Sequence, residues 1–316
     1  MPAFRRSITR GWLVLAALAL SAALLLTSLM AAASGSPQAS RQDPERELVV
    51  LAYHEIAEPS QAVMPDLAVS PVALRAQLQW MRAHGYHPIS VQQLLAAKRG
   101  AGQLPQRPVL LTFDDGYSSV FASAFPLLQE FHAPAVVAVV GRWLEPASGL
   151  VPFGDQTIDR RRLLSWSQLR QMQASGLVEV ASHSYDLHRG IAGNPQLNSM
   201  PAATTRQFTP GAGYESASAY RERLRRDLAA NSDLLERELG RRPRVIVWPY
   251  GRTNATAAAV ATELGMPVGF NLDDGANTAA VPLSGLRRVL MTAEMGRTAG
   301  LQQELLARRR NLTDPG

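Results

Sequence analysis

The chain has 316 residues, of which 46% are hydrophobic and 18% are charged. This balance supports a packed core and excludes wholesale disorder, and the absence of cysteine excludes disulfides, thiolate metal sites and a cysteine nucleophile. The formal net charge is +6, but the basic residues form no dense patch, so we do not expect nucleic-acid binding.

Residues 1–33 have the pattern of an export signal. Three arginines among the first ten residues precede an apolar run over 12–29, and the alanines at 31–33 offer a cleavage site of small residues. The run is also long enough to span a bilayer, so an uncleaved anchor that contacts the inner membrane is the alternative. In both cases we expect the protein to be exported to the periplasm or cell envelope.

A polar linker is expected over 34–47, followed by one α/β domain over 48–316. Within this domain, short apolar runs alternate with segments of helical period, and residues 189–219 have no clear period and predict a long surface loop. The expected strands are 48–53, 109–113, 135–140, 177–181, 245–248 and 268–271, and the expected helices are 74–81, 120–131, 166–174, 220–239 and 255–264. Continuous apolar strands between helices favour a parallel sheet, and their number fits a distorted or incomplete (β/α) barrel.

Two adjacent carboxylates follow one of these strands. Asp114 and Asp115 come directly after the strand that ends at Phe113. In a barrel of this type the chemistry lies at the carboxyl ends of the strands, and two carboxylates there are costly unless they hold a metal ion or a proton. An ordinary turn is the alternative, because Asp-Gly pairs are common in turns.

Histidines follow two other strands. His183 and His188 come after the strand 177–181, and His54 comes directly after the first strand. Two imidazoles and one carboxylate form a recurrent open metal site, so metal ligation is favoured over two surface histidines. Aromatic residues Trp248 and Tyr250 follow the strand 245–248, where they line a sugar groove or simply cover the core.

These motifs together resemble the polysaccharide deacetylase family of carbohydrate esterases. The segment 112–116 is similar to the family's signature, the histidine pair to its second motif, and 249–250 to its third. The resemblance extends from about residue 49 to about residue 305. It is closest to the exported deacetylases of poly-β-1,6-N-acetylglucosamine, a biofilm polymer. The features that resemble this branch are residues 53–54, the four residues between the two histidines of the pair, and the segments 214–225 and 247–251.

The resemblance implies a hydrolase that removes N-acetyl groups from N-acetylglucosamine units of an extracytoplasmic polymer. It implies one divalent metal ion held by Asp115, His183 and His188, with Zn as the default and Fe, Co or Ni as alternatives. Asp114 would be the general base. Contact with the machinery that exports the polymer is a further expectation.

The expected general acid is His54. Most of the family takes this acid from a C-terminal histidine, but no histidine follows His188 in this chain. Among the histidines outside the pair, only His54 follows a strand, and the likeness to the biofilm-polymer branch agrees. Another departure is Val247, which stands where most of the family has an arginine.

Four aromatic residues are expected near the substrate. They are Trp248 and Tyr250, which would line the acetyl and sugar pocket, Tyr185, and Tyr117, near which a backbone N–H would stabilise the oxyanion. Peptidoglycan or chitin-like oligomers are alternative substrates, and a catalytically dead polysaccharide-binding module is an alternative function. A glycosidase is disfavoured, because two carboxylates on one turn cannot lie on both sides of a glycosidic bond.

Overall fold

The computed structural model describes residues 47–154, 156–295 and 298–313. The expected export segment and nearly all of the expected linker lie outside these ranges. No helix within them is both long and apolar enough to cross a membrane.

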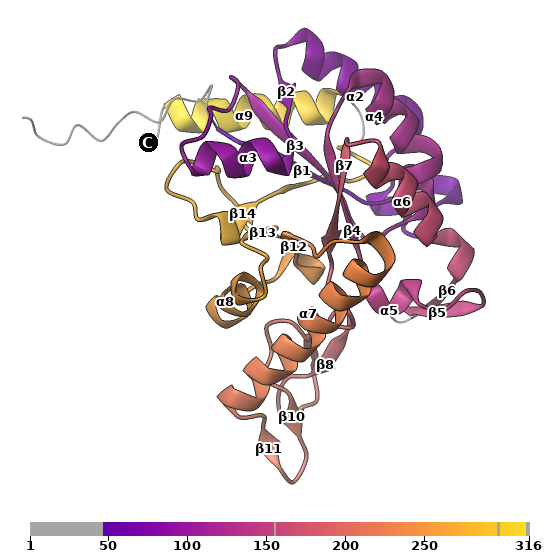
Figure 1. Ribbon diagram of the computed structural model, residues 1–316, viewed down its shortest axis with the longest axis vertical. Helices are drawn as coiled ribbons and strands as arrows, with labels where there is room; N and C mark the ends of the chain where they lie inside the picture. Colours follow the sequence, from indigo (N-terminus) through magenta and orange to yellow (C-terminus); the bar gives the residue numbers. More distant parts are fainter. Residues whose placement is uncertain (1–46, 155, 296–297, 314–316) are drawn as a thin grey trace, which may run out of the picture. The chain divides into compact units, whose positions relative to one another are not determined.

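A parallel sheet forms the centre of the domain (Figure 1). Its strand order is β14-β13-β12-β7-β4-β3-β1-β15, and β2 pairs separately with the start of β3. Every pairing in this sheet is parallel. The strands are β1 (Val49–Tyr53), β2 (His87–Pro88), β3 (Pro108–Phe113), β4 (Ala135–Val139), β7 (Val178–Ser182), β12 (Val245–Val247), β13 (Val268–Asn271), β14 (Leu286–Arg287) and β15 (Val289–Leu290).

The two ends of this sheet meet in one short stretch of chain. β14 pairs with β13, β15 pairs with β1, and only Arg288 separates β14 from β15. A single passage of chain therefore spans the seam and nearly closes the sheet into a barrel. The expectation of a distorted (β/α) barrel is confirmed.

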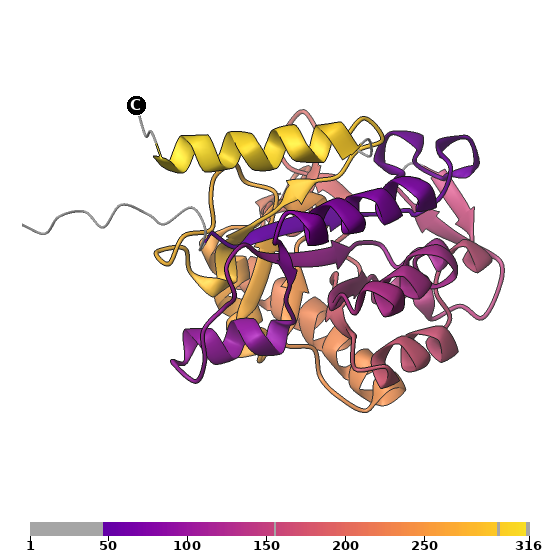
Figure 2. The same cartoon turned by 90° about the horizontal axis from the view of Figure 1, so that it is seen from above.

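Helices surround the barrel, as the view from above shows (Figure 2). Serine side chains cap several of them: Ser90 and Ser165 form capping boxes, and Ser216 caps the helix Ala217–Leu239. Gly240 ends this last helix in the left-handed conformation. The helices are α2 (Pro71–Ala83), α3 (Val91–Lys98), α4 (Phe125–Phe131), α5 (Gly141–Leu144), α6 (Trp166–Ala174), α7 (Ala217–Leu239), α8 (Ala255–Glu263) and α9 (Thr298–Thr313). Helices α3, α5 and α9, the short strand β2 and the two closing strands are not among the elements expected from the sequence.

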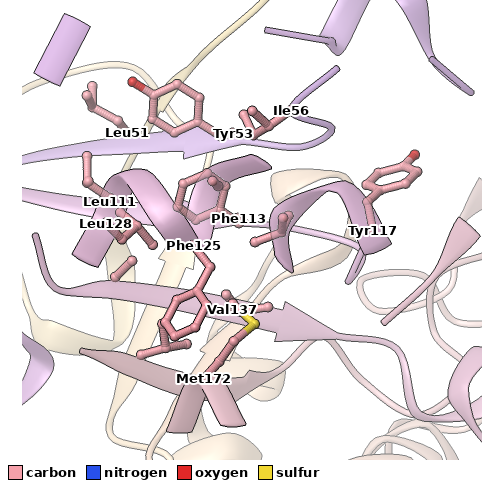
Figure 3. Packing of buried hydrophobic residues seen from close by; sticks show 14 of the residues in the cluster. Leu51, Tyr53, Ile56, Leu111, Phe113, Tyr117, Phe125, Leu128, Val137 and Met172 are labelled. Atoms are coloured by element: carbon pink, nitrogen blue, oxygen red, sulfur yellow. The ribbon is translucent and has the colours of Figure 1, made fainter. Parts of the chain in front are cut away.

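Alternate residues of each strand face opposite sides of the sheet. Leu51, Leu111 and Val137 lie with Leu128 and Met172 of α4 and α6 in the outer core (Figure 3). The intervening positions of β1, β3 and β4 form a separate cluster with residues of β12 and β13, inside the barrel. Because Asp114 follows Leu110 and Thr112 in this alternation, its side chain belongs to the barrel interior.

The expectation of a long irregular loop over 189–219 is wrong. The segment folds into two hairpins, β8 (Gly190–Ala192) with β9 (Ser199–Pro201) and β10 (Phe208–Thr209) with β11 (Gly213–Tyr214), before α7 begins (Figure 1). Strands of two or three residues are too short to show an alternating pattern. A further short pair, β5 (Leu150–Phe153) and β6 (Gln156–Asp159), follows α5.

Candidate active site

Polar side chains from four strand ends meet at the carboxyl end of the barrel, where parallel barrels place their chemistry. His54 follows β1, the two aspartates follow β3, and the histidine pair follows β7. Arg288 joins them from the seam between β14 and β15. This arginine is not among the site residues expected from the sequence.

Asp114 and Arg288 form a buried, two-pronged ion pair. The Arg288 Nη1 and Nη2 atoms donate to the two Asp114 carboxylate oxygens at 2.7 and 2.8 Å, and Nη1 also donates to the Thr112 hydroxyl at 2.9 Å. The Arg288 side chain is fully buried. Burial raises the pKa of Asp114, but Arg288 and the nearby histidines more than offset this, so the pKa lies below its usual value. Asp114 is therefore ionised at neutral pH.

The structure brings Asp115, His183 and His188 together. The Asp115 Oδ1 atom lies 3.4 Å from His183 Nε2 and 3.3 Å from His188 Nε2, and the three groups could hold a metal ion. The His183 Nδ1 atom lies 2.7 Å from the Val247 carbonyl oxygen, which can only accept, so Nδ1 carries the proton. Neutral His183 consequently presents the Nε2 lone pair to Asp115.

These three residues fit a divalent cation. Asp115 Oδ1 is buried and accepts no hydrogen bond from any residue that the structure describes. A buried carboxylate oxygen that faces two imidazole nitrogens is unfavourable unless a proton or a metal cation lies between them. His ligands and one carboxylate suit several transition metals.

The pKa values of the two imidazoles shift in opposite directions. Burial lowers the pKa of His188 to about 4, so its ring is neutral at pH 7 and free to ligate. Burial also lowers the pKa of His183, but Asp115 and Asp114 raise it more strongly. A proton and a metal cation therefore compete for His183 Nε2.

The backbone of the Asp-Gly turn helps to aim the aspartates. Asp115 and Gly116 both have left-handed φ angles, 67° and 68°. A Cβ on Gly116 would lie 3.0 Å from Val139 Cγ1. Position 116 therefore needs glycine both for its left-handed backbone and for the close approach of Val139. The turn that the sequence offered as an alternative is thus present, and it is part of the site.

His54 lies beside the Asp114 carboxylate. Its Nε2 atom is 4.0 Å from Asp114 Oδ2, and its side chain is 12% exposed. The Nδ1 atom is buried and has no hydrogen-bond partner among the described residues. An imidazole here can reach both the site and a group entering from solvent.

Trp248 does not line a substrate groove, and that expectation is wrong. Its side chain is fully buried beneath α7 and α8, in a cluster with Ile246, Leu228 and Val260. The reason is the alternation along β12: Ile246 and Trp248 face outward, whereas Val247 faces the barrel interior.

The other aromatic candidates occupy different environments. Tyr250 is 43% exposed, and its ring centroid lies 4.5 Å from that of His188. The half-buried Tyr185 donates its hydroxyl to Glu145 at 2.5 Å. The side chain of Tyr117 is fully buried against Phe153, which leaves only its backbone as a candidate contact.

Trp143 of α5 is a further neighbour of His188 that is not among the residues expected from the sequence. Its ring centroid lies 4.9 Å from that of His188 and 4.7 Å from that of Phe153. It is nearly fully buried. Together with Tyr250, this ring restricts the positions that His188 can adopt.

Comparisons with known proteins agree with this geometry. Residues 101–269 match the polysaccharide deacetylase family. The chain is 40% identical over 250 residues to the poly-beta-1,6-N-acetyl-D-glucosamine N-deacetylase of Escherichia coli K12, a match that covers 78% of this chain but only 37% of that one. The chain therefore spans little more than a third of that curated relative.

Solved structures are similar over most of this chain. The BpsB deacetylase domain from Bordetella bronchiseptica is 42% identical with a TM-score of 0.70, over 78% of this chain and 96% of that one. The de-N-acetylase from Aggregatibacter actinomycetemcomitans is 33% identical with a TM-score of 0.75, over 81% of this chain and 99% of that one. With its two aspartates and its histidine pair at the carboxyl end of a nearly closed barrel, the chain belongs to the polysaccharide deacetylase family.

Proposed function

We propose that this protein is a metal-dependent hydrolase that removes N-acetyl groups from N-acetylglucosamine residues of poly-β-1,6-N-acetyl-D-glucosamine outside the cytoplasm. The observation that carries the proposal is the buried Asp115 oxygen that faces two imidazole nitrogens, beside the ionised Asp114. The name of the 40% identical relative supports the choice of polymer. The sequence pattern of residues 1–33 supports export.

Asp115, His183 and His188 would hold the metal ion, with Zn as the default and Fe, Co or Ni as alternatives. When bound, such an ion polarises the acetamide carbonyl and makes a nearby water more acidic. The protein supplies the ligands and a water-poor surrounding, since all three side chains are largely buried.

Asp114 would act as the general base, and Arg288 would hold it ionised and correctly oriented. Asp114 accepts a proton from the attacking water as the water oxygen bonds to the acetyl carbon. A backbone N–H near Tyr117 would stabilise the negative oxygen of the tetrahedral intermediate. The carbon–nitrogen bond then breaks, His54 donates a proton to the sugar amine, and acetate and a glucosamine unit leave.

Tyr250 would contact the sugar beside the reacting acetyl group, because it is exposed next to His188. Tyr185 is a weaker candidate, because its hydroxyl is already bonded to Glu145. Trp248 has no such role. Peptidoglycan and chitooligosaccharides are the alternative substrates that the experiment must separate.

Acetate release from defined β-1,6-linked and β-1,4-linked N-acetylglucosamine oligomers, with and without a chelator, tests the proposal. We expect release from the β-1,6 oligomer that a chelator abolishes and added metal restores. The variant Asp115→Asn serves as the inactive control. Faster release from β-1,4 oligomers would favour the alternative substrates, and polymer binding with no acetate release would indicate a catalytically dead module.

A further inference from the structure

Strand β7 by itself does not bring His183 and His188 together. His183 and His188 are five residues apart, a spacing that puts them on neither one face of a helix nor one face of a strand. The loop between them must therefore turn sharply, and Ser184 adopts a left-handed φ of 70° within it. Such a backbone persists only if its surroundings hold it.

One side of this loop is held by α5. The backbone N–H groups of Gly141 and Arg142 donate to the carbonyl oxygens of Ser184 and Tyr185 at 3.2 and 3.0 Å. Only glycine fits at position 141, because a Cβ there would lie 2.3 Å from Asn231 Oδ1. The loop carbonyls are thus bonded to the first turn of a helix that follows β4.

The other side is held by α7, which packs against α5 and β7 (Figure 1). The two carboxylate oxygens of Asp227 accept the backbone N–H groups of Tyr185 and Asp186 at 2.9 and 2.8 Å. One helical turn later, the buried Asn231 donates to the Ser182 hydroxyl at 2.7 Å. That hydroxyl in turn accepts the Ser184 backbone N–H at 3.2 Å.

These two side chains are unfavourable for the helix that carries them. Asp and Asn have low helix propensity in a helix interior, because they compete with the backbone for hydrogen bonds. Asp227 and Asn231 lie well inside the 23-residue α7 and direct their polar atoms to the histidine loop instead. Neither side chain contacts the ligand atoms themselves.

We propose that Asp227 and Asn231 are positioning residues that set the separation and orientation of His183 and His188, and through them the metal affinity of the site. The inference rests on the proposed function, because it takes these histidines as metal ligands. Backbone N–H groups fixed by a carboxylate are the type of contact that keeps a turn in one conformation. The residues act on the metal through the loop.

The test is metal binding by the full chain, measured by titration of the metal-free protein with Zn²⁺ and by the visible spectrum of its Co²⁺ form. In Asp227→Asn, an amide N–H₂ replaces one acceptor opposite a backbone N–H. We expect affinity to fall on the order of 10- to 100-fold, as for other partners that orient metal ligands, with altered Co²⁺ absorption bands. Asp233→Asn is the matched control, since Asp233 is exposed on the same helix and pairs with Arg242. It should bind both ions as the parent protein does.

Zn²⁺ affinity within twofold of the parent, with an unchanged Co²⁺ spectrum, would overturn the positioning role. If Asp227→Asn does not fold, Asn231→Ser carries the test under the same criteria, because it removes the amide donor to Ser182. The variant His183→Ala separates the two proposals. If it also binds metal normally, the ligand assignment fails; if it loses metal while Asp227→Asn retains it, only the positioning role fails.

Discussion

Removal of the Arg288 guanidinium tests the electrostatics of the site. Arg288→Met has a similar length but no charge, and it leaves the buried Asp114 carboxylate without the two hydrogen bonds of 2.7 and 2.8 Å. Breaking one partner of a buried pair costs about 3–5 kcal/mol, because the remaining charge is uncompensated. We expect a loss of stability of this size at pH 7, measured by urea unfolding.

The same change should shift the pH dependence of turnover. Burial raises the pKa of Asp114 and Arg288 is the largest factor that lowers it, so the pKa rises when the arginine is removed. The acidic limb of the pH–kcat profile should therefore move to higher pH. In the parent protein the lowered pKa means that the pair stabilises the fold at neutral pH, and that this contribution is lost as the pH falls through the folded-state pKa.

Two further variants serve as comparisons for Arg288→Met. Arg287→Met is the control, because the side chain of this adjacent arginine bonds to the Ala276 carbonyl oxygen and not to Asp114. The double variant with Asp114→Asn should be more stable than Arg288→Met alone, since it removes the unpaired charge. An unchanged acidic limb in Arg288→Met, together with a stability loss below about 1 kcal/mol, would show that Arg288 does not stabilise the ionised Asp114 carboxylate.

Four other outcomes are expected. Asp114→Asn should keep its metal but lose turnover on the order of 10²–10⁴-fold, and near-normal acetate release at full metal content would exclude the base role. His54→Ala should lose most activity on sugar acetamides yet keep much of it on a phenyl acetate ester, whose leaving group needs little proton donation; equal losses on both substrates would remove His54 as the acid. Trp248→Ala should destabilise the fold by about 3–5 kcal/mol in urea unfolding, and a raised KM with unchanged stability would contradict its burial in the core. Burial raises the pKa of Asp227 to about 6, so this carboxyl favours the fold below its usual pKa and loses that contribution as the pH rises through 6. The stability of the parent relative to Asp227→Asn should then decrease from pH 4 to pH 7, and a constant difference would contradict the shift.

Much of the fold and the main polar cluster could be predicted from local sequence patterns. Continuous apolar runs with helices between them are a short-range signal, and they correctly indicated a parallel barrel. In such a barrel the residues after each strand share one end, which is why Asp114, Asp115 and the histidine pair could be brought together from spacing and a family resemblance alone.

The tertiary structure decided which side of each strand a residue faces and which distant residues meet. The position of Trp248 after an apolar run favours a groove, but the alternation along the three-residue β12 directs its side chain into the cluster beneath α7 and α8. Arg288 pairs with Asp114 across 174 residues, from a seam between two-residue strands that are too short to show any period. The hydrogen bonds from the backbone of Tyr185 and Asp186 to Asp227 likewise depend on the packing of α7 against α5 and β7. Sequence by itself determined most of the sheet strands and of the surrounding helices, and the end of the barrel at which the polar residues gather, because those signals are local. Barrel closure and side-chain pairing depend on contacts between segments far apart in the chain, which local patterns do not encode.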